Sequence, residues 1–120
     1  MGLQNKHKNE ISMPIRIYTS NPHLFIDLFD EKNNEIQIAD ESRLYLEKIR
    51  ECKDIETETI FYFSLILTST FAIDLVANWL YDRLKKEKGE TKLVIDEEEI
   101  TELDGEKIKK VIKCRLEFNK

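Results

Sequence analysis

Glycine is scarce in this sequence: the 120 residues contain three glycines, at positions 2, 89 and 105. A loop that cradles nucleotide phosphates needs several closely spaced glycines next to the start of a helix. Histidine is scarce as well, because the chain has two, His7 and His23, and neither has a second ligand residue at the spacing of a metal site. The sequence therefore predicts no cofactor-binding residues and no metal-binding residues.

Cysteine is limited to Cys52 and Cys114, which lie far apart. A disulfide framework in a short secreted chain normally follows a signal peptide, and the first ten residues, MGLQNKHKNE, have no apolar stretch of that kind. We therefore expect two reduced thiols and a cytoplasmic location. Catalysis by a cysteine would need His23 beside one of the thiols, and no pattern brings them together. We expect no enzyme activity and no catalytic residues.

Positive charge is in deficit, with 19 lysines and arginines against 24 acids, and the net charge is −5. Binding along a phosphate backbone depends on clustered lysine and arginine, so we expect no nucleic-acid partner. Near the C-terminus the two signs separate, because Asp96–Glu106 holds seven acids and no base, and Lys107–Arg115 holds five bases and no acid. Acids at the start of a helix and bases later in it complement the helix dipole, which favours a structural role for both blocks.

Long uncharged stretches are rare in a chain that is 36% charged, and Thr59–Tyr81 is the main exception, with Asp74 as its one charge. Its length would suffice for a membrane span of about 20 residues. Asp74 would cost about 2.5 to 3.5 kcal/mol in the middle of such a span. From Ile66 to Leu84, moreover, apolar residues recur on one side of a helix. We therefore predict a water-compatible helix from Glu58 to Lys88 that ends at Gly89.

The first half of this predicted helix is apolar nearly all round. Phe63, Leu67 and Phe71 recur every four residues, on the side that carries Asp74 further along. A helix that is apolar all round must be covered on all sides. Either other elements of the same domain cover these residues, or the three together with Tyr62 bind another protein or a second copy of the chain. Tyr62, Phe63, Leu67 and Phe71 are thus the candidate partner-binding residues.

A single domain is expected from the length of the chain. The polar residues 1–10 predict a flexible tail, and residues 11–120 contain grouped apolar positions without an internal repeat or a long linker. The domain is therefore expected to extend over residues 11–120.

The N-terminal part of the domain begins with a strand. Residues 11–18 alternate between apolar and polar, and Pro14 is expected near the start of this strand or on a sheet edge. Asn21-Pro22 then predicts the opening of a short helix. A hairpin over residues 23–39 is the alternative, and residues 35–39 form a strand in both cases.

The remaining elements follow from spacing. Ser42–Lys53 has apolar residues at helical spacing and predicts a helix. Beyond Gly89, residues 92–96 and 99–103 predict two strands joined by a tight acidic turn, and residues 104–118 predict a C-terminal helix. The expected fold class is α+β, with a small mixed sheet packed against one long central helix and a C-terminal helix.

The second half of the chain resembles small bacterial proteins of the effector-associated constant component type, which are encoded beside effectors of conflict and defence systems. The likeness lies in the helical segment LVANWLYDRLKKEKG, the following strand TKLVID with a short turn and a second strand, and the N-terminal strand IRIYT. It covers about half the chain, and the aromatic residues before the helical segment depart from the Gly/Ala-rich pattern of the family. The resemblance implies an adaptor that acts by association, with no catalytic residue to carry over.

These observations predict a non-enzymatic, cytoplasmic accessory or adaptor component that binds another protein or itself through the long helix. One alternative is a small acidic inhibitor that blocks a host complex, with Asp96–Glu106 as its contact surface. The other is a single-pass membrane-anchored protein that uses residues 59–81.

Overall fold

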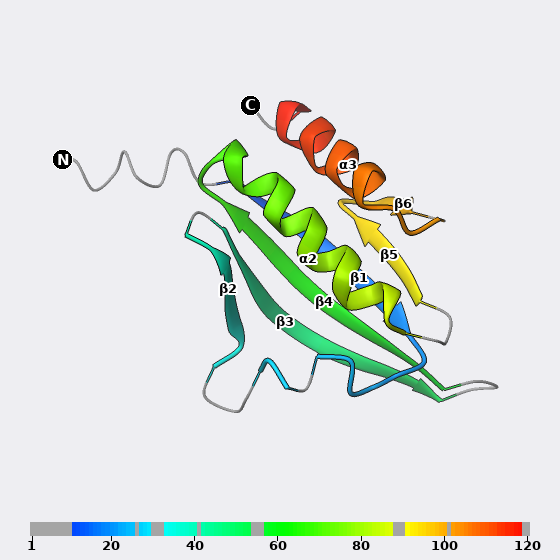
Figure 1. The fold of residues 1–120 in the computed structure, drawn as a ribbon. Helices are drawn as coiled ribbons and strands as arrows, with labels where there is room; N and C mark the ends of the chain where they lie inside the picture. Colours follow the sequence, from blue (N-terminus) through cyan, green and yellow to red (C-terminus); the bar gives the residue numbers. More distant parts are fainter. Residues whose placement is uncertain are drawn as a thin grey trace.

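The computed structural model describes residues 11–25, 27–29, 33–40, 42–53, 57–87, 91–100 and 102–118. The predicted tail over residues 1–10 lies outside these ranges. The elements are β1 (Ile11–Thr19), β2 (Glu35–Ala39), β3 (Ser42–Lys53), β4 (Thr57–Leu67), the 3-10 helix η1 (Thr70–Ala72), α2 (Ile73–Lys85), β5 (Thr91–Ile95), β6 (Glu98–Ile100) and α3 (Gly105–Phe118) (Figure 1).

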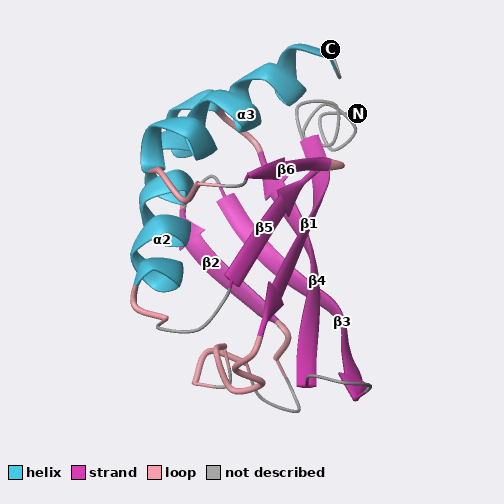
Figure 2. Ribbon diagram, turned by 90° about the vertical axis from the view of Figure 1, so that its right-hand side faces the viewer, coloured by secondary structure: helices cyan, strands magenta, loops and turns pink. Residues whose placement is uncertain are grey.

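The strands form one six-stranded sheet in the order β2-β3-β4-β1-β5-β6, and every neighbouring pair is antiparallel. Helices α2 and α3 both lie on the same face of this sheet (Figure 2). The predicted α+β class is therefore confirmed, but the sheet is larger than expected and is antiparallel throughout. The central helix is also shorter than expected, because α2 has 13 residues.

The prediction of a central helix over Glu58–Lys88 is wrong in its first half, because β4 occupies that part of the chain. Along β4 the side chains alternate between the two faces of the sheet, so Phe61, Phe63 and Leu65 all point toward the helices and are buried. A recurrence of four residues is two full periods of a strand and also close to one turn of a helix. Spacing alone therefore could not separate the two structures here, although aromatic and β-branched residues favour a strand.

The predicted helix over Ser42–Lys53 is also wrong, since this segment is β3 and pairs with β4 along its whole length. A β-bulge lies between Leu46 and Lys48, where the register shifts by one residue. The residues on the helix side are therefore Leu44 and Leu46 before the bulge and Ile49 after it. The three-residue step from Leu46 to Ile49 across the bulge matches the spacing of a helix, which explains the wrong prediction.

Several local predictions are confirmed. Strand β1 covers the predicted residues, and Pro14 lies near its start, where the ladder to β5 ends at the pair Ile15↔Ile95. The Pro14 carbonyl oxygen still accepts a hydrogen bond from the Asp96 N–H at 2.8 Å. The strand at residues 35–39, the two strands after residue 90 and the C-terminal helix are also present, with the last strand ending earlier than expected.

The described part of residues 21–29 forms neither the predicted helix nor a hairpin strand. Two successive turns occur instead, closed by hydrogen bonds from Leu24 N–H to the Asn21 carbonyl oxygen at 3.3 Å and from Leu28 N–H to the Phe25 carbonyl oxygen at 3.0 Å. The Asn21 side chain accepts a hydrogen bond from the N–H of His23 at 2.9 Å, as expected of a residue that opens a turn.

The hydrophobic core lies between the sheet and the two helices. Phe25, from the turns after β1, packs edge-to-face against Phe61 and Phe63, with ring centroids 5.0 and 5.1 Å apart. The second half of the predicted central helix is confirmed, because α2 buries the expected apolar side. Its buried residues are Ile73, Val76, Ala77, Leu80 and Leu84, and those of α3 are Ile108, Val111, Ile112 and Leu116.

Candidate functional site

The four predicted partner-binding residues do not form one surface. Phe63 and Leu67 are each 1% exposed and belong to the core, on the helix-facing side of β4. Tyr62 lies on the opposite face of the same strand, where it pairs with Arg16 of β1. Phe71 is 87% exposed and lies in η1, after the end of β4. The predicted arrangement on one helix is thus corrected, and Phe71 is the most accessible of the four.

Phe71 has an exposed apolar neighbour in Leu75, which was not among the predicted partner-binding residues. The Ser69 side chain accepts a hydrogen bond from the Phe71 N–H at 3.1 Å, which fixes the start of η1. Leu75 follows four residues later, in the first turn of α2, and is 55% exposed. We call Phe71 and Leu75 the apolar patch. A shallow hollow beside it is lined by Ala39, Asp40, Phe71, Ala72 and Leu75.

This pair is unusual among the described residues. Ile49 of β3 is the third exposed large apolar residue, at 50%, and the others are at least partly covered. A single exposed apolar side chain is ordinary on a soluble protein, whereas neighbouring ones form a surface that a partner can cover. Leu75 could have been found from the sequence, because it lies two residues after Ile73 and outside the stripe that α2 buries.

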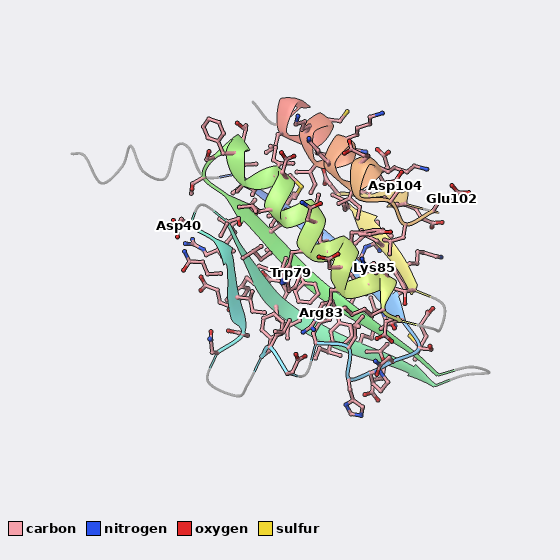
Figure 3. The ribbon with its side chains drawn as sticks, in the orientation of Figure 1. Asp40, Trp79, Arg83, Lys85, Glu102 and Asp104 are labelled. Atoms are coloured by element: carbon pink, nitrogen blue, oxygen red, sulfur yellow. The ribbon has the colours of Figure 1, made fainter. Side chains whose placement is uncertain are left out.

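The apolar patch adjoins an edge of the sheet. In the described part of the chain β2 pairs with β3 alone, so its other side carries no strand (Figure 1). Ile36 and Ile38 are half-buried on the helix side of β2, while Glu35 and Gln37 are exposed. Asp40 stands at the end of β2, and the same residue lines the hollow beside the patch (Figure 3). An open strand edge and an accessible apolar pair therefore meet at one place.

The face of the sheet opposite the helices carries tyrosines that are already engaged within the chain. The Lys48 ammonium lies 4.6 Å from the centroid of the Tyr62 ring, and an Arg16 guanidinium N–H donates a hydrogen bond to the Tyr18 hydroxyl at 3.0 Å. Ile60 lies on this face and is only 7% exposed. Because these side chains already contact one another, this face exposes less apolar surface to a partner than the apolar patch does.

Several acids of the block Asp96–Glu106 form ion pairs or hydrogen bonds within the fold. The guanidinium group of Arg115 lies 3.9 Å from Asp96 and 3.3 Å from Glu98, and so joins the turn between β5 and β6 to α3. The Asp104 carboxylate accepts a hydrogen bond from the N–H of Glu106 at 3.0 Å, at the start of α3 (Figure 3). These contacts support the structural interpretation of the acidic block.

Backbone strain in this block gives a stability prediction. Asp96 and Glu97 form the two-residue turn between β5 and β6, with φ angles of 45° and 75°. This region of φ suits asparagine or glycine, and it costs other residues about 1 kcal/mol or more. Glu97→Gly should therefore raise the free energy of unfolding by about 1 kcal/mol, measured by urea denaturation. Glu97→Ala removes the charge but keeps the side-chain strain, and should give no comparable gain.

Ion pairs shift the pKa of a few groups at the surface. The hydrogen bond from Lys109 to Asp74, at 2.8 Å, lowers the pKa of Asp74 and raises that of Lys109. Two hydrogen bonds from Arg83, at 2.8 and 2.9 Å, lower the pKa of Asp27 in the same way. A lowered pKa keeps each carboxylate charged to lower pH, so both pairs persist until the pH falls below the usual range of aspartate. These groups link α2 to α3 and to the turns after β1.

Other sequence predictions concern metals, membranes and thiols. The described residues contain no group of three or more His, Cys, Asp or Glu side chains that could hold a metal ion. Within the described ranges, no helix combines the length and apolar composition of a membrane span, and residues 59–81 are divided between β4, η1 and α2. Cys52 is half-buried and Cys114 is exposed, and both are free thiols.

Comparisons with models of protein families, with curated proteins and with solved structures gave no match to this chain.

Proposed function

We propose that this protein is a non-enzymatic binding component that associates with a second protein chain through the apolar patch, Phe71 and Leu75. The observation that carries the proposal is the exposure of both side chains at the start of α2, in a protein that covers nearly all its other large apolar residues in the described ranges. Full burial of a Phe or Leu side chain contributes about 1.5 to 3 kcal/mol. Burial of the apolar patch by a partner would therefore contribute a substantial part of the free energy of binding.

The surroundings of the apolar patch also suit a protein partner. Interfaces commonly have a small apolar centre surrounded by polar groups. Here Asp40 and Asp74 are the polar neighbours, one lining the hollow and the other next to Leu75 in the first turn of α2. Two side chains make a small contact area, so further contacts from the adjoining edge of the sheet would be needed for stable binding. In this proposal the chain is an adaptor, in line with its resemblance to conflict-system components, and carries no catalytic site.

The test of this proposal is the double variant Phe71→Ser with Leu75→Ser. Because both side chains are exposed, the variant should keep its far-UV circular dichroism and its unfolding midpoint. Its binding should weaken at least about tenfold, since about 1.4 kcal/mol corresponds to a factor of ten. Binding is measured as the concentration dependence of the molar mass in solution and as retention of other proteins on immobilised chain.

Ile49→Ser is the matched control, because Ile49 is similarly exposed but lies alone on β3. It should bind like the natural chain in both assays. If the double variant is folded and binds as well as the natural chain, the apolar patch is not the contact surface and the proposal is wrong.

A further inference from the structure

We propose that the face of the sheet opposite the helices binds single-stranded nucleic acid, with four basic side chains for its phosphates and two tyrosine rings for its bases. We call these residues the basic platform: Arg16, Tyr18, Lys48, Arg50, Tyr62 and Lys92. They come from four adjoining strands, β3, β4, β1 and β5. The inference concerns a second surface and does not rest on the proposed function, because the apolar patch belongs to η1 and α2.

Strand alternation directs Arg16 and Tyr18 of β1 away from the helices. Their neighbours Ile15 and Ile17 are fully buried in the core between the sheet and the helices. Since successive side chains of a strand point to opposite faces, Arg16 and Tyr18 belong to the face opposite the helices (Figure 2). Both side chains are half-buried there, so part of each is accessible.

The register of the sheet arranges the basic platform in two rows across four strands. In one row Lys48, Tyr62, Arg16 and Val94 lie side by side, and in the next row Arg50, Ile60, Tyr18 and Lys92 do so. No acid occupies any of these eight positions. Each row is about 14 Å wide, because neighbouring strands lie about 4.8 Å apart. Two cations and one tyrosine in each row thus form a compact positive surface.

This cluster is not visible along the chain, because its four basic residues lie at positions 16, 48, 50 and 92. The expectation of no nucleic-acid partner was based on net charge and on clustering in the sequence. Binding depends on the local field, however, and the fold gathers four positive charges on one face of a chain whose net charge is −5. The present proposal therefore replaces that expectation for this face.

Acidic side chains border the basic platform without entering its two rows. The Glu47 carboxylate, at the bulge of β3, accepts a hydrogen bond from the Ser64 hydroxyl at 2.9 Å. Glu58 of β4 is exposed one row further along, and Glu99 of β6 lies 3.6 Å from the Lys92 ammonium. A pair as exposed as the last one is weak, so a phosphate can replace Glu99. The acids confine the positive charge, which suits a short stretch of nucleotides.

The two tyrosine rings are placed to stack on bases. The Lys48 ammonium lies 4.6 Å from the centroid of the Tyr62 ring, and the Lys92 ammonium lies 5.4 Å from that of Tyr18. A base stacks on an aromatic ring more strongly than an exposed cation binds over it. A base would therefore take the place of the ammonium over each ring. The flexible lysine side chain would stay close enough to pair with the adjoining phosphate.

The combination of rings and cations favours single strands over other polyanions. Tyr18 and Tyr62 are diagonal neighbours on β1 and β4, about 7 to 8 Å apart, so they can receive two neighbouring bases. RNA-binding sheets stack two or three bases on aromatic side chains in this way. A duplex keeps its bases paired and stacked on one another, and a chain of carboxylates has no rings to stack. Both should bind more weakly than a single strand.

The test begins with the natural chain and fluorescein-labelled single strands of about ten nucleotides, in uridine and in deoxythymidine. Fluorescence anisotropy should give saturable binding, with a dissociation constant of about 10⁻⁴ to 10⁻⁶ M at physiological salt. If four phosphates are neutralised, the logarithm of the binding constant should fall against that of the salt concentration with a slope of about −3. The comparison of the two strands shows which sugar is preferred.

Lys48→Glu with Arg50→Glu is the first variant, because both side chains are exposed and can be replaced without opening the core. The dissociation constant should rise at least about tenfold and the salt slope should fall by about half. Lys107→Glu with Lys110→Glu is the matched control, since it changes the net charge equally with two exposed lysines of α3, on the other side of the sheet. Its dissociation constant should stay within about twofold of the natural value, because distant charges are screened.

Tyr62→Leu tests stacking separately from charge. Leucine keeps an apolar side chain on the sheet but removes the aromatic ring, so the dissociation constant should rise about fivefold or more. Tyr62→Phe keeps the ring and should bind like the natural chain. Circular dichroism and thermal unfolding establish that every variant is folded.

Several results would overturn the proposal. These are no saturable binding by the natural chain, equal loss of binding in the α3 control, and equal binding of Tyr62→Leu and the natural chain. Competition by a duplex or by oligoglutamate of the same length that equals competition by the single strand would also overturn it, and would indicate a general site for polyanions. Weaker binding in both platform variants, with binding retained in Tyr62→Phe and in the α3 control, supports it. The variant Phe71→Ser with Leu75→Ser should bind the single strands normally, so the proposed function is tested independently.

Discussion

Replacing Phe63 by alanine should lower the free energy of unfolding by about 3 to 5 kcal/mol, because a buried aromatic side chain is lost and a cavity remains. Phe63 is almost fully buried and packs against the ring of Phe25 at 5.1 Å. Phe71→Ala is the matched control, and should change the free energy of unfolding by less than about 0.5 kcal/mol, since its side chain is already exposed to water. Urea denaturation followed by circular dichroism measures both.

This comparison distinguishes a strand from a helix in the middle of the chain. Had Phe63 and Phe71 shared one exposed stripe of a long helix, their replacement would have similar and small effects on stability. Equal effects in the two variants would therefore contradict the position of Phe63 in β4.

Leu80→Ala should destabilise the protein by about 2 to 5 kcal/mol, whereas Leu75→Ala should cost less than about 0.5 kcal/mol. The two leucines belong to the same helix, α2, but Leu80 is fully buried against the sheet and Leu75 lies in the apolar patch. The same change of side chain is thus tested on the two sides of one helix. Thermal unfolding provides the measurement, with midpoint shifts of about 2 to 8 °C for each kcal/mol at this chain length.

A large loss of stability in Leu75→Ala would show that this side chain packs inside the domain, which would also remove the basis of the proposed function. If Leu75→Ala is neutral for stability but weakens self-association, the apolar patch has a role outside the folding of the single chain. Leu80→Ala provides the reference for the effect of losing a buried leucine from α2.

The candidate site was only partly predictable. Phe71 was selected from the sequence because it follows Phe63 and Leu67 at a spacing of four. Its exposure has a different cause, since β4 ends at Leu67 and the chain turns at Ser69 before η1 begins. Leu75 was not among the predicted residues, because it lies outside the stripe of apolar residues that α2 buries. The open edge of β2 cannot be found by periodicity, because strand order depends on contacts between distant segments.

The amino-acid sequence by itself determined the elements whose signals are local. Alternation specified β1, and the acid-to-base order and apolar spacing of residues 104–118 specified α3. The stripe from Ile73 to Leu84 specified α2. In each case a single period describes the pattern, and the same few residues decide both the type of element and the side that is buried.

Only the tertiary structure decided that β3 and β4 are strands and not helices. A spacing of four residues suits both a strand and a helix, and the bulge after Leu46 makes β3 resemble a helix. The choice is made when β4 pairs with β3, the strand before it, on one side and with β1 on the other, because the hydrogen-bonding partners in β1 lie far away in the chain. The same pairing buries Phe63 and Leu67, and leaves Phe71 beside the open edge of β2.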